Sequence, residues 1–236
     1  MIRKFLAVMA VLFITSCAEL QQVVDSLPQD TNTILSNADI GSGLREALDK
    51  GIEKQVSKLT QKDGYFNNQL VKILLPEELK KVDKGLRDIG LSKLADEGLK
   101  VLNRAAEDAV STATPIFVDA VKGITFNDAK NILLGDDNAA TTYLKNGTSN
   151  TLYTKFNPVI KNSFAKVGAD KVWTNIITKY NSIPFVKKVN PDLTDYTTQE
   201  ALKGVYKMIA VEEKEIRTKV GARTTALLQK VFALQD

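Results

Sequence analysis

The spacing of apolar residues constrains this chain more than any other feature. After residue 36 they recur every four positions, at Leu44, Leu48, Ile52 and Val56. Residues spaced in this way share one face of an α-helix, whereas strong alternation of apolar and polar residues, typical of strands, is absent from the sequence. We therefore predict an all-α fold, a single domain of about nine to eleven helices packed in layers around one core.

Capping residues mark where several of these helices should begin and end. Ser36 with Asp39 is suited to cap a helix start. Thr125–Asp128 and Thr197–Glu200 have the spacing of an N-terminal capping box, in which a hydroxyl residue and an acidic residue three positions later bond reciprocally to the backbone. Glycine and proline weaken a helix interior. We therefore expect one helix to end at Gly147 and the next to be interrupted near Pro158.

The first 16 residues have the pattern of a secretory signal. Two positive residues, Arg3 and Lys4, precede the uncharged apolar run Phe5–Ile14, which is too short to cross a bilayer as a permanent helix. The sequence Ile14-Thr15-Ser16-Cys17 then resembles the lipobox of bacterial lipoproteins, in which the cysteine receives a lipid after cleavage. We predict a signal peptide over 1–16, lipidation of Cys17 with a tether over 17–35, and the helical domain over 36–236. The alternative is an ordinary cleaved signal with a cysteine near its end by chance.

The cysteine count supports lipidation. Cys17 is the only cysteine in 236 residues, and a lone free thiol is unusual in an exported protein unless it is modified. We expect an exported protein whose contact with the membrane runs through the lipid on Cys17, in the cell envelope of a diderm bacterium on the periplasmic face of the outer membrane. In the tether, Asp25-Ser26-Leu27 resembles a short O-glycosylation signal, so Ser26 is a candidate acceptor.

Composition excludes several classes of function. The chain has no histidine, so Ser-His-Asp and Cys-His nucleophile systems are impossible, as is zinc bound by histidine. We predict no metal and no cofactor. The formal charge is +4, and losing Arg3 and Lys4 with the signal would reduce it to +2. No dense basic cluster with interleaved aromatic residues is present, so we expect no nucleic-acid partner.

The helix expected near the C-terminus carries an acidic residue within its apolar face. Glu213 falls on the same stripe as Ile209 and Ile216. A buried carboxylate needs a partner, and Arg217 lies one turn further on, with Arg223 just beyond the helix end. The cluster is either a ligand-binding or catalytic site, or a buried ion pair that ties the last two helices to the core; we favour the ion pair.

A second polar cluster comprises Asn103, Arg104 and Glu107. On an edge helix these residues would form a solvated face. On a central helix they could line a cleft together with Glu213 and Arg217. We favour the solvated face.

Several short stretches resemble an uncharacterised family of bacterial envelope proteins, the domain of unknown function DUF4197. The stretches extend from Ile40 to Phe232 and are Gly43–Leu48, Asp63–Phe66, Asn103–Glu107, Pro115–Ala120, Ala139–Tyr143, Glu212–Glu213 with Ile216–Arg217, and Arg223–Thr224. The resemblance implies an exported helical protein and supplies no activity.

Two functions of different classes fit these observations. The first is a non-catalytic module that binds a partner protein or an apolar or anionic small molecule. The alternative is a carboxylate-dependent enzyme acting on envelope glycans, with Glu213 or Glu107 as its acid.

Overall fold

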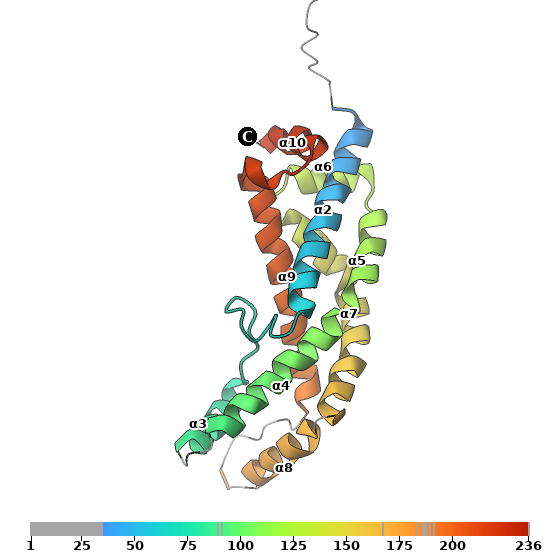
Figure 1. Cartoon of the computed structure of the whole chain (residues 1–236). Coiled ribbons are helices and arrows are strands. Elements are labelled where there is room, and N and C mark those ends of the chain that lie inside the picture. The colour runs from blue at the N-terminus through green and yellow to red at the C-terminus, as the bar shows by residue number, and fades with distance from the viewer. Residues whose placement is uncertain are drawn as a thin grey trace, which may run out of the picture. The chain divides into compact units, whose positions relative to one another are not determined.

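A computed structural model describes residues 35–235, apart from positions 89, 91, 167, 183, 186, 187, 189 and 191 (Figure 1). The predicted signal peptide, Cys17 and Ser26 lie outside the described residues, as does all of the predicted tether except Leu35. Residues from Leu35 onward form one compact unit.

The described residues contain helices and no strands, which confirms the all-α prediction. Eight α-helices have eight or more residues: α2 (Asn37–Thr60), α3 (Glu77–Asp88), α4 (Ser92–Val110), α5 (Ala113–Lys122), α6 (Phe126–Leu133), α7 (Ala139–Lys166), α8 (Ala169–Asn181) and α9 (Leu193–Thr218). They are followed by the 3-10 turn η1 (Val220–Ala222), the seven-residue helix α10 (Ala226–Phe232) and the 3-10 turn η2 (Ala233–Gln235). None of the described helices is long and apolar enough to span a membrane.

The expected breaks at Gly147 and Pro158 are wrong, because α7 continues through both. The upper end of the expected helix count was too high for this reason. Every turn of α7 buries a side chain, in the order Ala140, Leu144, Thr148, Leu152, Phe156, Ile160 and Phe164. Burial of one large apolar side chain contributes about 1.5–3 kcal/mol, whereas an interior glycine costs about 1 and a proline about 3. The free energy gained by burying these side chains therefore exceeds the cost of Gly147 and Pro158 in the helix interior.

The expected cap at Ser36 and the expected capping box at Thr125–Asp128 are confirmed. Ser36–Asp39 begins α2 and Thr125–Asp128 begins α6, each with both reciprocal hydrogen bonds. Hydrogen bonds from the Thr125 side chain and backbone hold the pKa of the Asp128 carboxyl below its usual value.

The other expected capping box, Thr197–Glu200, is wrong. The N-cap of α9 is Asp192, five residues before Thr197, and it accepts a hydrogen bond from the backbone N–H of Thr194. Thr197 instead lies inside the helix and is fully buried. Asp192 is favoured over Thr197 as the N-cap because the added turn of helix also buries Leu193.

Helix α2 packs against α9, α5, α6 and α10, and α7 packs along both α4 and α9 (Figure 1). Helices α6 and α10 lie at the end where α2 begins, and α3 and α8 lie at the other end. Helices α7 and α9 are antiparallel, because Glu213 late in α9 contacts Ala140 early in α7, while Thr198 contacts Asn157. The start of α7 thus lies beside the last turns of α9.

The loop after α2 is fixed to α9 by a buried tyrosine. Tyr65 is completely buried, and its hydroxyl donates to the backbone oxygen of Ala201 at 2.8 Å. Its ring lies directly over Gly204, where an added Cβ would stand 2.6 Å from a ring carbon. This contact requires glycine at position 204.

Gly204→Ala is expected to lower the free energy of unfolding by about 1–3 kcal/mol, because the methyl group overpacks against Tyr65. Gly147→Ala is the matched control: a Cβ there meets nothing within 4 Å, so helix propensity alone should raise stability by about 0.5–1 kcal/mol. Urea unfolding followed by circular dichroism measures both. Equal shifts of the same sign would contradict the packing at Gly204.

Candidate functional site

The carboxylate of Glu213 binds the start of helix α7. Its Oε1 accepts a hydrogen bond from the backbone N–H of Ala140 at 2.9 Å, and its Oε2 accepts from the N–H of Thr141 at 2.8 Å and from the Thr141 hydroxyl at 2.7 Å. The first N–H groups of a helix have no partner within the helix, and the helix dipole favours negative charge there. Glu213 therefore caps α7 from a different helix.

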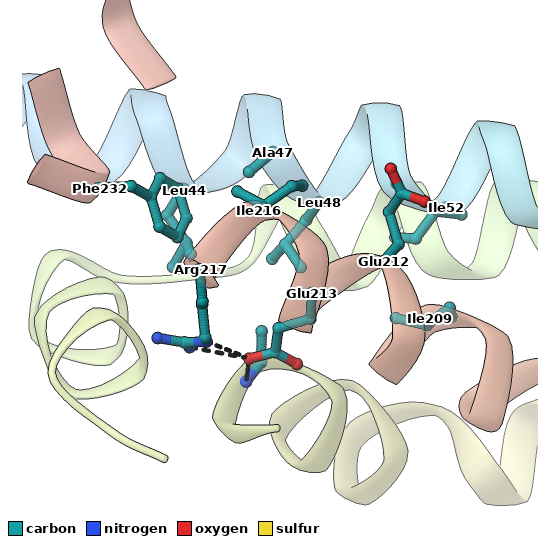
Figure 2. Close-up of a pocket in the computed structure, with 12 residues that line it drawn as sticks. Leu44, Ala47, Leu48, Ile52, Ile209, Glu212, Glu213, Ile216, Arg217 and Phe232 are labelled. Atoms are coloured by element: carbon teal, nitrogen blue, oxygen red, sulfur yellow. Dashed lines mark hydrogen bonds and ion pairs between the residues drawn. The ribbon is translucent and has the colours of Figure 1, made fainter. Parts of the chain in front are cut away.

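Arg217 lies one turn after Glu213 and binds the end of helix α6. Its guanidinium donates to Glu213 Oε1 at 3.0 and 2.8 Å, and to the backbone oxygens of Leu133 at 3.1 Å and Ile132 at 2.8 Å (Figure 2). These two carbonyls end α6, where the dipole favours positive charge. Both charged side chains are at most 6% exposed, so this ion pair is buried.

Arg223 satisfies the end of α9 itself. Its Nε donates to the backbone oxygen of Ile216 at 3.0 Å, and its Nη2 donates to that of Arg217 at 2.9 Å. Arg223 is 2% exposed, so these bonds are shielded from water. The three charged residues that the sequence groups together therefore lie in one buried network, and each of them binds the end of a helix.

The cavity beside this network is small. It lies between α2 and α9, is lined mainly by apolar residues such as Leu48, Ile52 and Ile209, and has a volume of about 20 Å³ (Figure 2). A cavity needs roughly 10–15 Å³ to hold one water molecule. The space next to Glu213 and Arg217 therefore admits about one water and no larger ligand.

Glu212, next to Glu213, makes a separate contact that the sequence analysis did not identify. Figure 2 shows the two carboxylates pointing apart, Glu212 toward α2 and Glu213 toward α7. Glu212 accepts hydrogen bonds from Lys54 and from Gln55, each at 2.6 Å. The apolar pattern provides only a weak signal for this contact, because Glu212 lies at the border of the apolar face of α9.

Asn103 holds the extended segment before α3 against α4. Its side-chain oxygen accepts from the backbone N–H of Ile73 at 2.8 Å, and its side-chain nitrogen donates to the backbone oxygens of Ile73 at 2.9 Å and Leu99 at 2.8 Å. Asn103 is fully buried, so the expectation of a solvated position is wrong for this residue.

Glu107 is also buried, and it binds the loop after α2. Its carboxylate accepts from the backbone N–H groups of Asp63 at 3.2 Å and Tyr65 at 3.1 Å, and from Arg104 at 3.0 Å. The Arg104 side chain is 43% exposed and also bonds to Asp63 at 3.2 Å. Arg104 is therefore the member of this cluster that lies at the surface.

The two predicted clusters do not converge on a shared cleft. Tyr65, which binds Glu107, packs on Gly204 of α9. Gly204 is nine residues before Glu213, which is roughly 14 Å along a helix. Asn103, Arg104 and Glu107 do not line the cavity beside Glu213 and Arg217.

The described surface has larger hollows elsewhere. One of them has a volume of about 480 Å³ and lies between α7 and α9, where Lys145, Lys203 and Lys207 line it. No group of three or more acidic, cysteine or histidine side chains suited to a metal ion occurs among the described residues. Nothing in the sequence pattern identified this hollow, because its residues come from two helices that are far apart in the chain.

Glu213→Gln is expected to lower the free energy of unfolding by about 3–5 kcal/mol, because it leaves Arg217 buried without its counter-charge. The matched control is Glu215→Gln on the same helix, which removes the exposed ion pair with Lys219 and should cost less than about 0.5 kcal/mol. Urea unfolding measures both changes. Unchanged or increased stability of Glu213→Gln would instead indicate a residue kept for function at the expense of stability.

Comparison with known proteins identifies the family. The family described as protein of unknown function (DUF4197) matches residues 34–233, which is most of the chain and includes both clusters. No curated protein and no solved structure matches the chain. The resemblance found in the short sequence stretches is confirmed, and the chain belongs to the DUF4197 family.

Proposed function

We propose that this protein is an exported lipoprotein whose helical domain is a non-catalytic binding module, held at a membrane by lipid on Cys17. One observation carries the non-catalytic part of the proposal. The two carboxylates best placed in the sequence to act as acids, Glu213 and Glu107, are each bonded to backbone N–H groups of the domain itself.

This arrangement weakens the case for an enzyme acting on envelope glycans. A general acid must hold a proton within hydrogen-bond reach of the substrate. Both oxygens of Glu213 accept hydrogen bonds from within the domain, and its only adjacent cavity has room for about one water. Glu107 does not line that cavity, and its carboxylate accepts hydrogen bonds from the backbone N–H groups of Asp63 and Tyr65.

The anchoring part of the proposal rests on the sequence. The lipobox-like Ile14-Thr15-Ser16-Cys17 follows an apolar run of signal length, and Cys17 is the only cysteine. Lipid on this residue would hold the domain in the cell envelope, and we place it at the periplasmic face of the outer membrane. Its partner would then be a component of that compartment, either a small molecule or another protein.

Cys17→Ser is expected to abolish incorporation of labelled palmitate and to move the protein from the membrane fraction to the soluble periplasmic fraction. Without the thiol no diacylglycerol can be attached, and stable anchoring needs such chains. Ser16→Ala is the matched control, because it keeps a small residue before the cysteine and should leave labelling intact. A Cys17→Ser protein that still carries label would refute lipidation at this residue.

Native mass spectrometry of the full chain, released from detergent micelles, tests the binding module. We expect a stoichiometric adduct that is lost on denaturation, or a protein that crosslinks to the chain in cells. An apo mass combined with no crosslinked partner would contradict the proposal. Conversion of the recovered adduct into a product by the purified protein would show an enzyme instead.

A further inference from the structure

The hollow between α7 and α9 differs from the others in charge. Lys145 of α7 and Lys203 and Lys207 of α9 line it, and no Asp or Glu is among the described residues of its wall. We name it the lysine groove. Its volume of about 480 Å³ lies within the 300–1,000 Å³ typical of small-molecule sites.

The other hollows contain opposite charges. The hollow beside α8, of about 240 Å³, has Asp170 and Asp192 with Lys161 in its wall. The hollow beside α3, of about 460 Å³, combines Glu77 and Glu200 with lysines. The lysine groove differs from these two hollows in having no acidic side chain among the described residues of its wall.

Two of the three lysines have no acidic partner among the described residues. Lys203 pairs with Glu200 at 2.6 Å, but Lys145 and Lys207 make no ion pair with any described residue. Helices α7 and α9 bring these two ammonium groups to one groove, where like charges repel. An anion bound between them would remove that repulsion.

Hydroxyl and amide groups accompany the lysines. The buried Tyr206 hydroxyl lies in the groove wall and is within 2.7 Å of the Thr148 hydroxyl and 3.3 Å of that of Ser149. Burial raises the pKa of Tyr206, so the phenol stays neutral near pH 7. Thr142 and Asn138 add exposed polar side chains at the start of α7.

The start of α7 itself is not the source of attraction. The N–H groups of Ala140 and Thr141 are occupied by Glu213, whose negative charge also offsets the helix dipole. Attraction in the groove therefore depends on the lysine side chains.

We propose that the lysine groove binds a small anionic ligand bearing phosphate groups, with Lys145 and Lys207 as its principal contacts. This names the ligand class and site of the binding module proposed above and rests on that proposal. Lysine binds phosphate as a flexible point charge, without the bidentate fork by which arginine recognises both carboxylate and phosphate. No arginine is among the described residues of the groove wall.

The phosphate could belong to a soluble compound or to the headgroup of an anionic lipid. Two probes distinguish these sources. Pyrophosphate represents the soluble compound, and vesicles of phosphatidylcholine containing phosphatidylglycerol represent the lipid headgroup. Vesicles of phosphatidylcholine alone measure attachment that does not involve an anionic headgroup.

The test is calorimetric titration of the full chain in detergent with pyrophosphate at constant ionic strength, and flotation with the two vesicle types. The wild-type protein should bind one pyrophosphate saturably, or float more with the anionic vesicles. The double variant Lys145→Gln/Lys207→Gln should weaken that binding about tenfold or more, because two charge-assisted contacts are lost.

A matched control separates the groove from general charge. Lys58→Gln/Lys155→Gln removes the same charge from two other exposed lysines of α2 and α7 that make no ion pair with any described residue. This control should bind as the wild type does. Unchanged thermal unfolding of both double variants would show that they remain folded, as expected for exposed side chains.

Equal weakening in both double variants would mean diffuse attraction and would overturn the groove as a site. Binding of neither probe by the wild type would also overturn it. Either failure leaves the binding module itself testable, since a co-purified adduct retained by the Lys145→Gln/Lys207→Gln variant would support the module at another surface.

Discussion

The carboxylate of Glu213 and the guanidinium of Arg217 join three helices at one buried point. Glu213 accepts hydrogen bonds from N–H groups at the start of α7 that lack a partner within the helix, and Arg217 donates to carbonyls at the end of α6. Each charge lies at the helix end whose dipole it complements, and the two pair with each other at 2.8 Å. Such a buried pair is costly to break, so the positions of α6, α7 and α9 depend on it.

The same principle applies where α4 meets the loop after α2 and the segment before α3. Glu107 of α4 binds the backbone of the loop after α2, and Asn103 binds the backbone of the segment before α3. The side chains of Glu213, Arg217, Glu107 and Asn103 thus bind backbone groups that lack a partner within a helix. The carboxylates of Glu213 and Glu107 are bonded to backbone N–H groups of the domain itself. Lys145 and Lys207, by contrast, lie at the surface of the lysine groove.

Sequence reasoning identified the residues of the buried network but not the backbone groups that they bind. The apolar stripe of α9 identified Glu213, and the spacing of one turn identified Arg217. Their targets in α6 and α7 follow only from tertiary packing. Local rules failed for α7, where Gly147 predicted a helix end. The helix continues because its side chains on either side of Gly147 are buried against other helices. The lysine groove could not be predicted, because Lys145 and Lys207 become neighbours only when α7 and α9 pack together.

Amide hydrogen exchange at Ala140 and Thr141 is the most direct test of this account. The first N–H groups of a helix ordinarily exchange quickly, because they lack a partner within the helix. Here both N–H groups are bonded to a buried carboxylate, so their exchange should require global unfolding of the domain. Glu213→Gln should accelerate the exchange of these two amides more than that of the interior amides of α7. Rapid exchange of these two amides in the wild-type protein would contradict the claim that Glu213 caps α7.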